Sequence, residues 1–391
     1  MIFDLNFSIV TIVLSAVLLL LTLYIVICYR GRVARVAERR AALEAGERVE
    51  DSRLKPVSVV VYACENSERL EKLLERLLCQ NYAPGYEVIV VNDGGGHSVG
   101  DMVTRYSHKF PHLKLTFVPD NAHNLSRRKL AITLGIKAAA YDYILLTTAD
   151  CELPGEEWVH SMARHFADGN EVVLGVSTIK GDDGERLSFM NRMGQLHDTV
   201  AWVSEALRDA AYRGTRYNMG YSKALFFKHK GFARTLNIHD GDDDLFVSEI
   251  ANGNRVAMEI SGESIVEVCT VKPSLTYKED KKRHAFTARL SDRNPARIIN
   301  SMPWLLWLSI ALGVAAGVTA IPNPVPGAVA FVLLAVQWIV VSRVWAKSSA
   351  AVGMKVSGWG VIPGLLRMPF HKMKYSLSSR RDSHLNYTWH N

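Results

Sequence analysis

The stretch at residues 57–78 decides the fold, and it reads VSVVVYACENSERLEKLLERLL. Its first five residues are almost all valine, which is typical of a short strand that is buried on both faces of a sheet. Leucines then recur at helical spacing, at Leu70, Leu73, Leu74 and Leu77, and this predicts a helix directly after the strand. The stretch therefore predicts the first strand and helix of a parallel sheet.

The same alternation continues along the chain. Residues 87–91, 113–118 and 143–146 are further candidate strands, and residues 127–140 have a helical pattern. Strands that alternate with helices imply βαβ units and a mostly parallel, Rossmann-like sheet covered by helices on both faces. Residues 55–290 are long enough to form one large domain around a single core. We therefore expect an α/β domain over residues 55–290.

Two apolar regions flank this domain. Residues 7–29 carry no charged side chain, and about 20 apolar residues are enough to cross the hydrocarbon core of a bilayer. A signal peptide is disfavoured because the run is too long and no small-residue cleavage site follows. Residues 301–342 are also uncharged and contain three prolines between 322 and 326, which predicts a hairpin of two spans. We expect transmembrane helices at 7–29, 301–321 and 325–345.

The distribution of charge predicts the orientation of these spans. Arginines cluster directly after the first span, and basic residues flank both ends of the hairpin. By the positive-inside bias, the basic and charged connector at 30–54 and the domain at 55–290 lie in the cytoplasm, and residues 1–6 lie outside. Residues 356–391 mix apolar and charged side chains, which favours an interfacial segment and a basic cytoplasmic tail. We expect a multi-pass protein of the cell (inner) membrane.

The overall composition excludes several classes of protein. The chain has 391 residues and a net charge of +7, with 48% hydrophobic and 22% charged residues, so it is neither disordered nor collagen-like. Its five cysteines are far apart, which favours reduced thiols over a disulfide framework or a zinc site. The basic charge fits anionic lipid and phosphate groups better than nucleic acid, because no nucleic-acid motif is present.

Acidic side chains follow several strands of the expected sheet. Glu65 comes shortly after the first strand, which ends near Ala63, Asp93 follows the second, and Asp150 and Glu152 follow the fourth. Ligands of such sheets bind outside the carboxyl ends of the strands, so these residues are candidates for a site. The chain contains neither GxGxxG nor GxxxxGK[ST], so neither a dinucleotide-binding fold nor a P-loop is supported.

Each acidic candidate has a structural and a functional interpretation. Asp93 precedes three glycines, so it either begins a turn or accepts hydrogen bonds from a base or ribose. Asp150 and Glu152, two residues apart, either cap the helix near Glu156 or hold a divalent cation that bridges phosphates.

Two charged clusters lie further along the chain. Residues 239–245 read HDGDDDL, and four aspartates in five residues exceed what a helix N-terminus needs. Crowded carboxylates repel one another, so we expect one of them to have a raised pKa and to act as a general base. In the cluster at 278–284 the lysines suit a lipid-facing flank, whereas Arg283 and His284 could donate hydrogen bonds to a leaving diphosphate. Lys129 is a further candidate for contact with phosphate.

These pieces, in this order, resemble the family 2 glycosyltransferases, the inverting GT-A enzymes that include membrane polysaccharide synthases. The resemblance covers about residues 55–290 and the membrane layout. The segment at 57–63 looks like the family's opening strand, with Glu65 as its acidic partner. The matching motifs are the nucleotide-binding aspartate at Asp93, the GKAxALNxGI-like segment containing Lys129, the metal-binding Asp150, the ED-x-DL-like run at 241–245, and Arg283-His284 at the place of the RW in QxxRW.

The resemblance implies a metal-dependent hexosyltransferase that uses a nucleotide diphosphosugar donor with Mg²⁺ or Mn²⁺. It places the catalytic base at Asp242, or at Asp243 if the register slips by one residue. The acceptor implied is membrane-associated, a lipid-linked sugar or a growing glycan. The sequence departs from the family at Thr148, Gly241, Asp280 and His284. These departures leave open an alternative, a non-catalytic membrane component that keeps the fold as a binding or sensing module.

Overall fold

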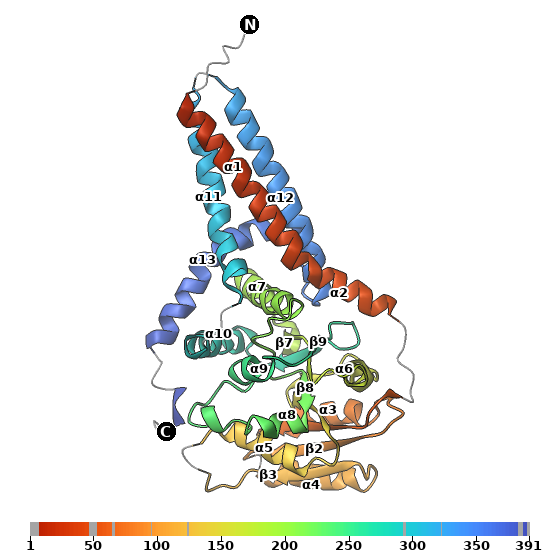
Figure 1. Cartoon of the computed structure of the whole chain (residues 1–391). Helices are drawn as coiled ribbons and strands as arrows, with labels where there is room; N and C mark the ends of the chain where they lie inside the picture. Colours follow the sequence, from red (N-terminus) through yellow and green to blue (C-terminus); the bar gives the residue numbers. More distant parts are fainter. Residues whose placement is uncertain are drawn as a thin grey trace.

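The computed structural model describes residues 8–46, 53–64, 67–94, 96–122, 125–291, 295–321, 323–381 and 386–388. Figure 1 shows three long helices that rise from one side of an α/β domain. Glu65, one of the residues singled out from the sequence, lies outside the described residues.

The domain is built on a seven-stranded sheet. Its order is β3 (Leu113–Phe117), β2 (Tyr86–Asn92), β1 (Val57–Ala63), β4 (Tyr143–Thr148), β8 (Met219–Ser222), β6 (Val172–Leu174) and β9 (Val256–Met258). The first four strands are parallel, β8 runs antiparallel to both of its neighbours, and β6 and β9 are parallel again. The prediction of an α/β fold with a mostly parallel sheet is confirmed.

The valine runs of the sequence form the centre of this sheet because both of its faces are covered. One face packs on α3 (Ser67–Leu77), α4 (Gly96–Ser107) and α6 (Trp158–Ala167). The other face packs on α5 (Arg127–Ala138). The two layers approach closely at Gly135, where an added Cβ would lie 2.4 Å from a methyl carbon of Val60. Only a residue without a side chain fits there.

A second, three-stranded sheet lies beside the first. Its order is β5 (Cys151–Glu152), β10 (Val266–Thr270) and β7 (Ser177–Gly181). Because β5 follows β4 after only two residues, the small sheet begins where the carboxyl end of the large sheet stops. The rim predicted from the sequence therefore faces a second structural layer.

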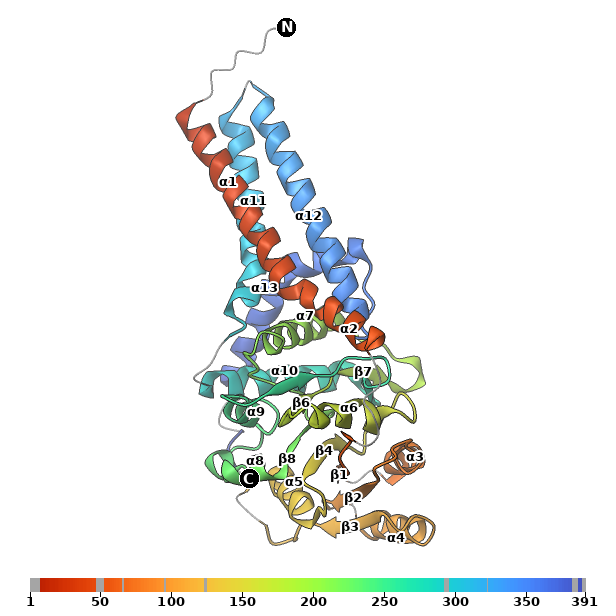
Figure 2. The ribbon, with the colours of Figure 1, turned by 45° about the vertical axis from the view of Figure 1, so that its right-hand side comes forward.

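Helices fill the space between the sheets and the apolar helices. α7 (Phe189–Ala206) and α10 (Pro273–Leu290) lie on the side of the domain that faces the long helices, and the short α8 (Lys223–Lys228) and α9 (Leu245–Ile250) lie lower (Figures 1 and 2). The side chain of Asp244 caps α9 by accepting a hydrogen bond from the backbone nitrogen of Leu245 at 2.7 Å. One aspartate of the acidic run is thus used as a helix cap.

Three helices are long and apolar enough to cross a membrane. They are α1 (Ile9–Cys28) with its continuation through a π turn (Tyr29–Val33) into α2 (Ala34–Ala45), α11 (Arg297–Thr319), and α12 (Val325–Ala351). Some of their polar side chains pair inside the bundle. Gln337 accepts a hydrogen bond from Thr22 at 3.2 Å and donates one to Ser309 at 2.9 Å. Such pairing is what polar groups need at membrane depth.

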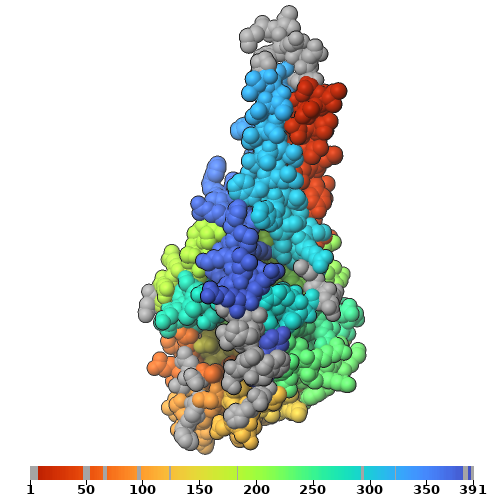
Figure 3. Space-filling model, turned by 90° about the vertical axis from the view of Figure 1, so that its left-hand side faces the viewer, coloured from red at the N-terminus to blue at the C-terminus, as the bar shows by residue number. Residues whose placement is uncertain are grey.

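The segment after α12 is a helix, α13 (Gly358–Arg381). Pro363 and Pro369 lie inside this helix and do not end it. One face of α13 packs on α7, α10 and α12, and Figure 3 shows it lying against the side of the domain. The opposite face exposes Trp359, Phe370 and Met373. α13 is therefore amphipathic, and its apolar surface continues from α11 through a ring contact of Phe370 with Trp304.

Candidate functional site

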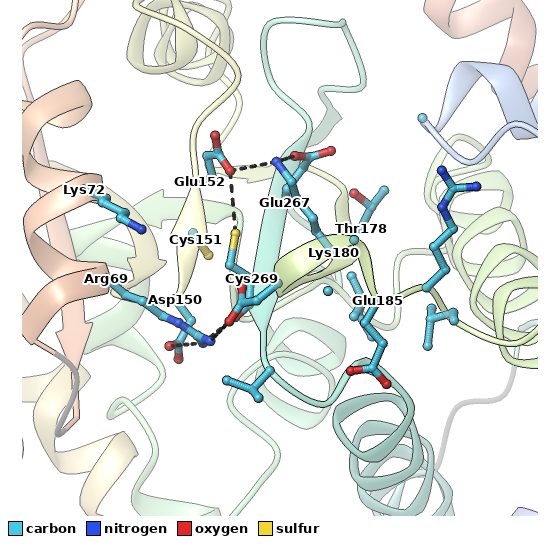
Figure 4. Close-up of a pocket in the computed structure, with 18 of the residues that line it drawn as sticks. Arg69, Lys72, Asp150, Cys151, Glu152, Thr178, Lys180, Glu185, Glu267 and Cys269 are labelled. Carbon is cyan, nitrogen blue, oxygen red and sulfur yellow. Dashed lines mark hydrogen bonds and ion pairs between the residues drawn. The ribbon is translucent and has the colours of Figure 1, made fainter.

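A cavity of 990 Å³ opens at the edge where the two sheets meet. Its walls come from α3, the turn between β4 and β5, β7 with the loop that follows, the start of α7, and residues 353–355 directly after α12. Figure 4 shows charged side chains from several of these elements pointing into the same space. The cavity is of the size that small-molecule sites have.

Asp150 lies on the wall of this cavity, as its position after β4 predicts. Its Oδ1 accepts a hydrogen bond from Arg69 Nη1 at 3.1 Å, and Nη2 of the same arginine lies 2.7 Å from Asp182 Oδ2. The Asp150 side chain is 46% exposed, so its carboxylate is open to a ligand in the cavity. Arg69 was not singled out from the sequence, because nothing in its local pattern indicates that α3 turns it toward this rim.

Glu152 lies on the same wall but has a different partner. Its Oε2 accepts a hydrogen bond from Lys180 Nζ at 2.9 Å, and Lys180 also lies 2.8 Å from Glu267. The Lys180 hydrogen bond outweighs partial burial and holds the pKa of Glu152 below its usual range. Figure 4 shows Asp150 and Glu152 on the two sides of Cys151, each next to its own cation. The two carboxylates therefore share the cavity but not a partner.

The donor set at this wall fits a hard divalent cation, because Mg²⁺ and Mn²⁺ prefer carboxylate oxygens. Two carboxylates leave the remaining positions of such an ion to phosphate oxygens and water. Within the described parts of the chain, three or more metal-type ligand atoms converge within 4.8 Å only at Asp243, Asp244 and His284. That group is buried, and Arg283 Nη1 already lies 2.7 Å from Asp243 Oδ1, so it suits a cation less well.

Asp93 and Ala63 lie at the carboxyl ends of β2 and β1, outside the walls of the 990 Å³ cavity. The backbone of Asp93 donates a hydrogen bond to the carbonyl of Ala63 at 2.8 Å. Its carboxylate accepts hydrogen bonds from Tyr62 Oη and from Arg127 Nε, both at 2.7 Å. Asp93 is thus held in a fixed orientation, and its role toward a nucleotide stays a prediction.

The prediction that Lys129 contacts phosphate is wrong for this structure. Lys129 is completely buried, and its Nζ donates hydrogen bonds to the carbonyls of Thr235, Ile238 and Asp240 at 2.6, 3.1 and 2.6 Å. Burial lowers the pKa of Lys129 to about 8. The ammonium group therefore ties α5 to the segment that precedes the acidic run, and it has no free side for a ligand.

Asp242 is buried between two arginines. Its Oδ2 accepts a hydrogen bond from Arg128 Nε at 2.9 Å and its Oδ1 accepts one from Arg216 Nη2 at 2.6 Å. Burial alone would raise the pKa of Asp242, but Arg216 and Arg128 outweigh it, and the pKa lies below its ordinary value. Asp242, where the resemblance places the base, is therefore not the carboxylate whose pKa is raised by crowding.

Crowding instead acts on Asp244, the helix cap. Burial and the neighbouring Asp243 raise the pKa of Asp244 to about 6. Asp243 itself accepts a hydrogen bond from Arg283 Nη1 at 2.7 Å. Burial would raise the pKa of Asp243 too, but Arg283 and Arg216 hold it well below its ordinary value.

Arg283 and His284 lie on α10, next to Asp243 and away from Asp150. His284 Nε2 is 3.5 Å from Asp243 Oδ2, and its Nδ1 accepts a hydrogen bond from Arg213 Nη2 at 2.8 Å. Because an arginine can only donate, the His284 proton sits on Nε2, toward Asp243. Burial and the charges of Arg213 and Arg283 lower the pKa of His284 well below its ordinary value, which keeps the ring neutral.

The structure thus divides the predicted site residues into three groups. Asp150 and Glu152 line the open cavity, Ala63 and Asp93 lie at the neighbouring strand ends, and Asp242, Asp243, Arg283 and His284 form a buried network. The Arg128 guanidinium connects the last two groups, because it lies 4.7 Å from the ring centre of Tyr62 while it holds Asp242. Sequence reasoning missed Arg69, Arg128, Arg213 and Arg216, because each of them meets a carboxylate or a histidine that lies on another element.

Comparisons with known proteins agree with this geometry. Residues 58–238 match the model of glycosyl transferase family 2. A segment of 119 residues is 27% identical to chondroitin synthase of Pasteurella multocida (strain Pm70), and it covers 30% of this chain and 12% of that protein. This chain is thus matched to only a small part of that relative.

Two solved structures are also similar in arrangement. The mannosyltransferase PcManGT from Pyrobaculum calidifontis, in complex with GDP-Man and Mn²⁺, has a TM-score of 0.49 at 17% identity, covering 91% of this chain and 99% of its own. S. aureus TarS has a TM-score of 0.41 at 16% identity, covering 84% and 55%. TM-scores below 0.5 are too low to transfer any detail from those structures.

The family match and the sheet are independent observations that agree. The matched segment contains the four parallel strands, the antiparallel β8 and the acidic residue after β4. Residues 58–238 therefore resemble the family 2 glycosyltransferases, and the α/β domain that contains them is joined to three helices that can span a membrane.

Proposed function

We propose that this chain transfers a hexosyl unit from a nucleotide diphosphosugar, with Mg²⁺ or Mn²⁺, to a membrane-associated acceptor in one inverting displacement. The observation that carries the proposal is the composition of the 990 Å³ cavity. It joins the carboxylates of Asp150, which follows β4, and Glu152, which lies in β5, to a wall formed by residues directly after α12. A donor and a membrane-held acceptor would meet in such a place.

The donor side of the cavity combines two kinds of charge. Asp150 and Glu152 would hold the divalent cation, which when bound neutralises charge on the departing diphosphate. Lys72 and Arg76 of α3 line the same cavity, and neither forms an ion pair with another described residue. Their charges suit the phosphates of a donor. Asp93, at the neighbouring strand end, is the candidate for the nucleoside.

The location of two cavity residues supports the proposal of a membrane-associated acceptor. Met354 and Lys355 line the cavity and follow α12, the last of the three apolar helices. A sugar on a lipid carrier, or the end of a glycan held at the bilayer, would reach the cavity from this wall. We place the domain on the cytoplasmic side of a cell membrane, because arginines follow α1 and basic residues flank the hairpin.

In the proposed displacement the acceptor oxygen forms a bond to the anomeric carbon, and the bond from that carbon to the diphosphate breaks. The acceptor proton passes to a carboxylate, for which the chain offers Asp242 and Asp243. Asp243 is the better placed of the two, because its neighbours Arg283 and His284 line a small cavity next to the open one. Both oxygens of Asp242 accept hydrogen bonds from arginine side chains, whereas Asp243 Oδ2 accepts its hydrogen bond from the backbone nitrogen of Arg216 at 3.3 Å.

The two carboxylates are compared by neutral substitutions that keep their shape. A general base contributes roughly 10²–10⁴-fold to a rate. We expect Asp243→Asn to lose turnover by this factor and to keep donor binding, while Asp242→Asn loses less. Loss in Asp242→Asn alone would move the role to Asp242, and full turnover in both would remove the role from this run.

The metal and donor site has a matched control. Asp150 and Asp182 bind different nitrogens of the same Arg69, so each substitution removes one carboxylate partner of that arginine. We expect Asp150→Ala to abolish Mn²⁺-dependent binding of a nucleoside diphosphate, and Asp182→Ala to keep it. Nucleotide release by the purified full-length protein, screened across donor sugars, tests the transfer itself. Wild-type binding by Asp150→Ala would contradict the proposed donor site.

One observation favours the alternative of a non-catalytic module. Asp242 and Asp243 are buried and fully ion-paired, so neither lines the open cavity. A binding module would release no nucleotide with any donor sugar, yet it would still bind nucleotide in a manner that depends on Asp150. The donor screen separates the two functions.

A further inference from the structure

The Arg69 side chain lies between two carboxylates at the wall of the open cavity. It reaches out from α3, and its Nη1 lies 3.1 Å from Asp150 Oδ1 while its Nη2 lies 2.7 Å from Asp182 Oδ2. Nη1 also donates a hydrogen bond to the backbone carbonyl of Cys269 at 2.5 Å. Figure 4 shows the guanidinium group beside Asp150. One cation thus holds two carboxylates, of which one follows β4 and the other follows β7.

The position of this guanidinium matters because Asp150 is a proposed ligand of the divalent cation. Within the described ranges, neither Asp150 nor Asp182 forms an ion pair with any residue other than Arg69. The Asp150 and Asp182 side chains are 46% and 36% exposed, so both remain open to the cavity. A divalent cation that binds Asp150 comes close to the like charge of Arg69, and like charges at such distances repel. Arg69 therefore acts against a cation that arrives alone.

Lys72 and Arg76 follow Arg69 along the same helix. Their spacing in α3 puts the three cations on one face, and all three line the open cavity. A diphosphate bound to Lys72 and Arg76 would lie about one helical turn from Arg69, where side chains are roughly 5–6 Å apart. Arginine binds phosphate oxygens through paired N–H donors. The diphosphate is thus a competing acceptor for the Arg69 guanidinium.

We propose that Arg69 couples the binding of the divalent cation to the binding of the donor diphosphate. Without ligands, the guanidinium stays on Asp150 and Asp182. When a nucleoside diphosphate binds, Arg69 turns its Nη1 donor from Asp150 to a phosphate oxygen, and Asp150 becomes available to the cation. The inference rests on the proposed function, because the cation site at Asp150 is part of that proposal.

This coupling has a thermodynamic consequence. The cation and the diphosphate each bind weakly alone, and by linkage each raises the affinity for the other by the same factor. A cation that bridges phosphates gives some coupling by itself, so the part that depends on Arg69 is the quantity to measure. A purely structural role, in which Arg69 only ties α3 to β10 and to the residue after β7, leaves this factor unchanged.

Binding of Mn²⁺ to the full-length protein in nanodiscs tests the inference. Electron paramagnetic resonance measures free Mn²⁺ in a titration without nucleotide, and calorimetry gives the affinity for UDP and GDP with and without Mn²⁺. We expect Arg69→Gln to bind Mn²⁺ alone about tenfold more tightly than the wild type, and its coupling factor to fall about tenfold. Arg76→Gln is the matched control, because it removes the same charge from the same face of α3 and Arg76 forms no ion pair with a described carboxylate. The control should change either quantity by less than about threefold.

Arg69→Lys separates the charge of Arg69 from its packing. Lysine keeps the positive charge, so Arg69→Lys should bind Mn²⁺ alone with nearly the wild-type affinity. Equal Mn²⁺ affinity in Arg69→Gln and Arg76→Gln would overturn the inference, and so would a gain in Arg69→Lys as large as that in Arg69→Gln. The wild type gives a test that does not depend on the folding of a variant: equal Mn²⁺ affinity with and without the bound nucleotide also overturns the inference.

Asp150→Ala distinguishes this inference from the proposed function. Mn²⁺ binding that survives in Asp150→Ala would contradict the proposed donor site, and the role of Arg69 with it. Binding that requires Asp150 but is not tightened in Arg69→Gln would overturn the role of Arg69 alone.

Discussion

Replacement of Lys129 by methionine tests the carbonyl cage around its ammonium group. The substitution removes a charged donor from three backbone carbonyls and keeps most of the side-chain volume. Hydrogen bonds from a charged donor contribute roughly 1.5–3 kcal/mol each, so about 4.5–9 kcal/mol is lost. The lowered pKa of Lys129, about 8 against 10.5, shows that burial disfavours the charge, and its removal returns about 3 kcal/mol. We expect a net loss of about 1.5–6 kcal/mol, and we take about 3 kcal/mol as the working value.

This loss of stability can be measured as a decrease in the melting temperature. At roughly 2–4 °C per kcal/mol for a domain of this size, Lys129→Met should melt roughly 6–12 °C below the wild type. Lys137→Met, an exposed lysine on the same helix, is the control and should melt within about 1–2 °C of the wild type. Equal melting temperatures for the two variants would refute the reasoning.

The pH dependence supplies a second readout. Because the pKa of Lys129 is about 8 in the folded protein and about 10.4 in an unfolded chain, the unfolded chain binds more protons between these values. The free energy of unfolding of the wild type should therefore rise from pH 8 to pH 10. Lys129→Met should lack its share of this rise, and a difference between the two proteins that stays constant over the window would contradict the assignment.

Three further predictions concern packing, buried charge and the membrane. Gly135→Ala should lower the melting temperature, because the added Cβ would lie 2.4 Å from a methyl carbon of Val60. This clash should outweigh the better helix propensity of alanine. An unchanged melting curve would contradict the close approach. The hydrogen bond with His165 lowers the pKa of the buried Glu259 to about 2, against the effect of burial. The wild type should therefore lose stability as the pH falls from about 4.5 to 2, which acid titration followed by circular dichroism measures. Glu259→Gln should lack that loss. Trp359 is 87% exposed at the start of α13, and brominated lipids should quench its fluorescence. Trp359→Phe should remove that part of the quenching. Equal quenching of both proteins would place this face of α13 away from the bilayer.

The parts of the fold that the sequence predicts are those controlled by burial. The strands near Val59, Val90 and Leu145 are apolar runs because helices cover both faces of the sheet. The apolar helices can be recognised in the sequence because charged side chains are costly in the hydrocarbon core of a bilayer. Asp150 could be placed at the rim because it directly follows a strand, and strand ends determine where side chains emerge.

The parts that the sequence does not predict depend on partners from distant elements. The order of pKa values among Asp242, Asp243 and Asp244 is set by arginines on α5, on the loop before β8 and on α10. No local pattern shows which arginine meets which carboxylate. The role of Lys129 could not be predicted for the same reason. The residues next to it in the sequence do not show whether its ammonium group contacts a phosphate or backbone carbonyls.

If the proposed function is correct, the wall formed by Met354 and Lys355 connects the bilayer mechanically to the transfer reaction. A soluble fragment ending at residue 290 would keep Asp150 and lose this wall, so its kinetics would describe an incomplete enzyme. In the whole chain, a thicker or thinner bilayer changes the tilt of an apolar helix such as α12. Such a change of tilt would move the wall of the cavity, and lipid chain length would then affect the rate of the proposed reaction.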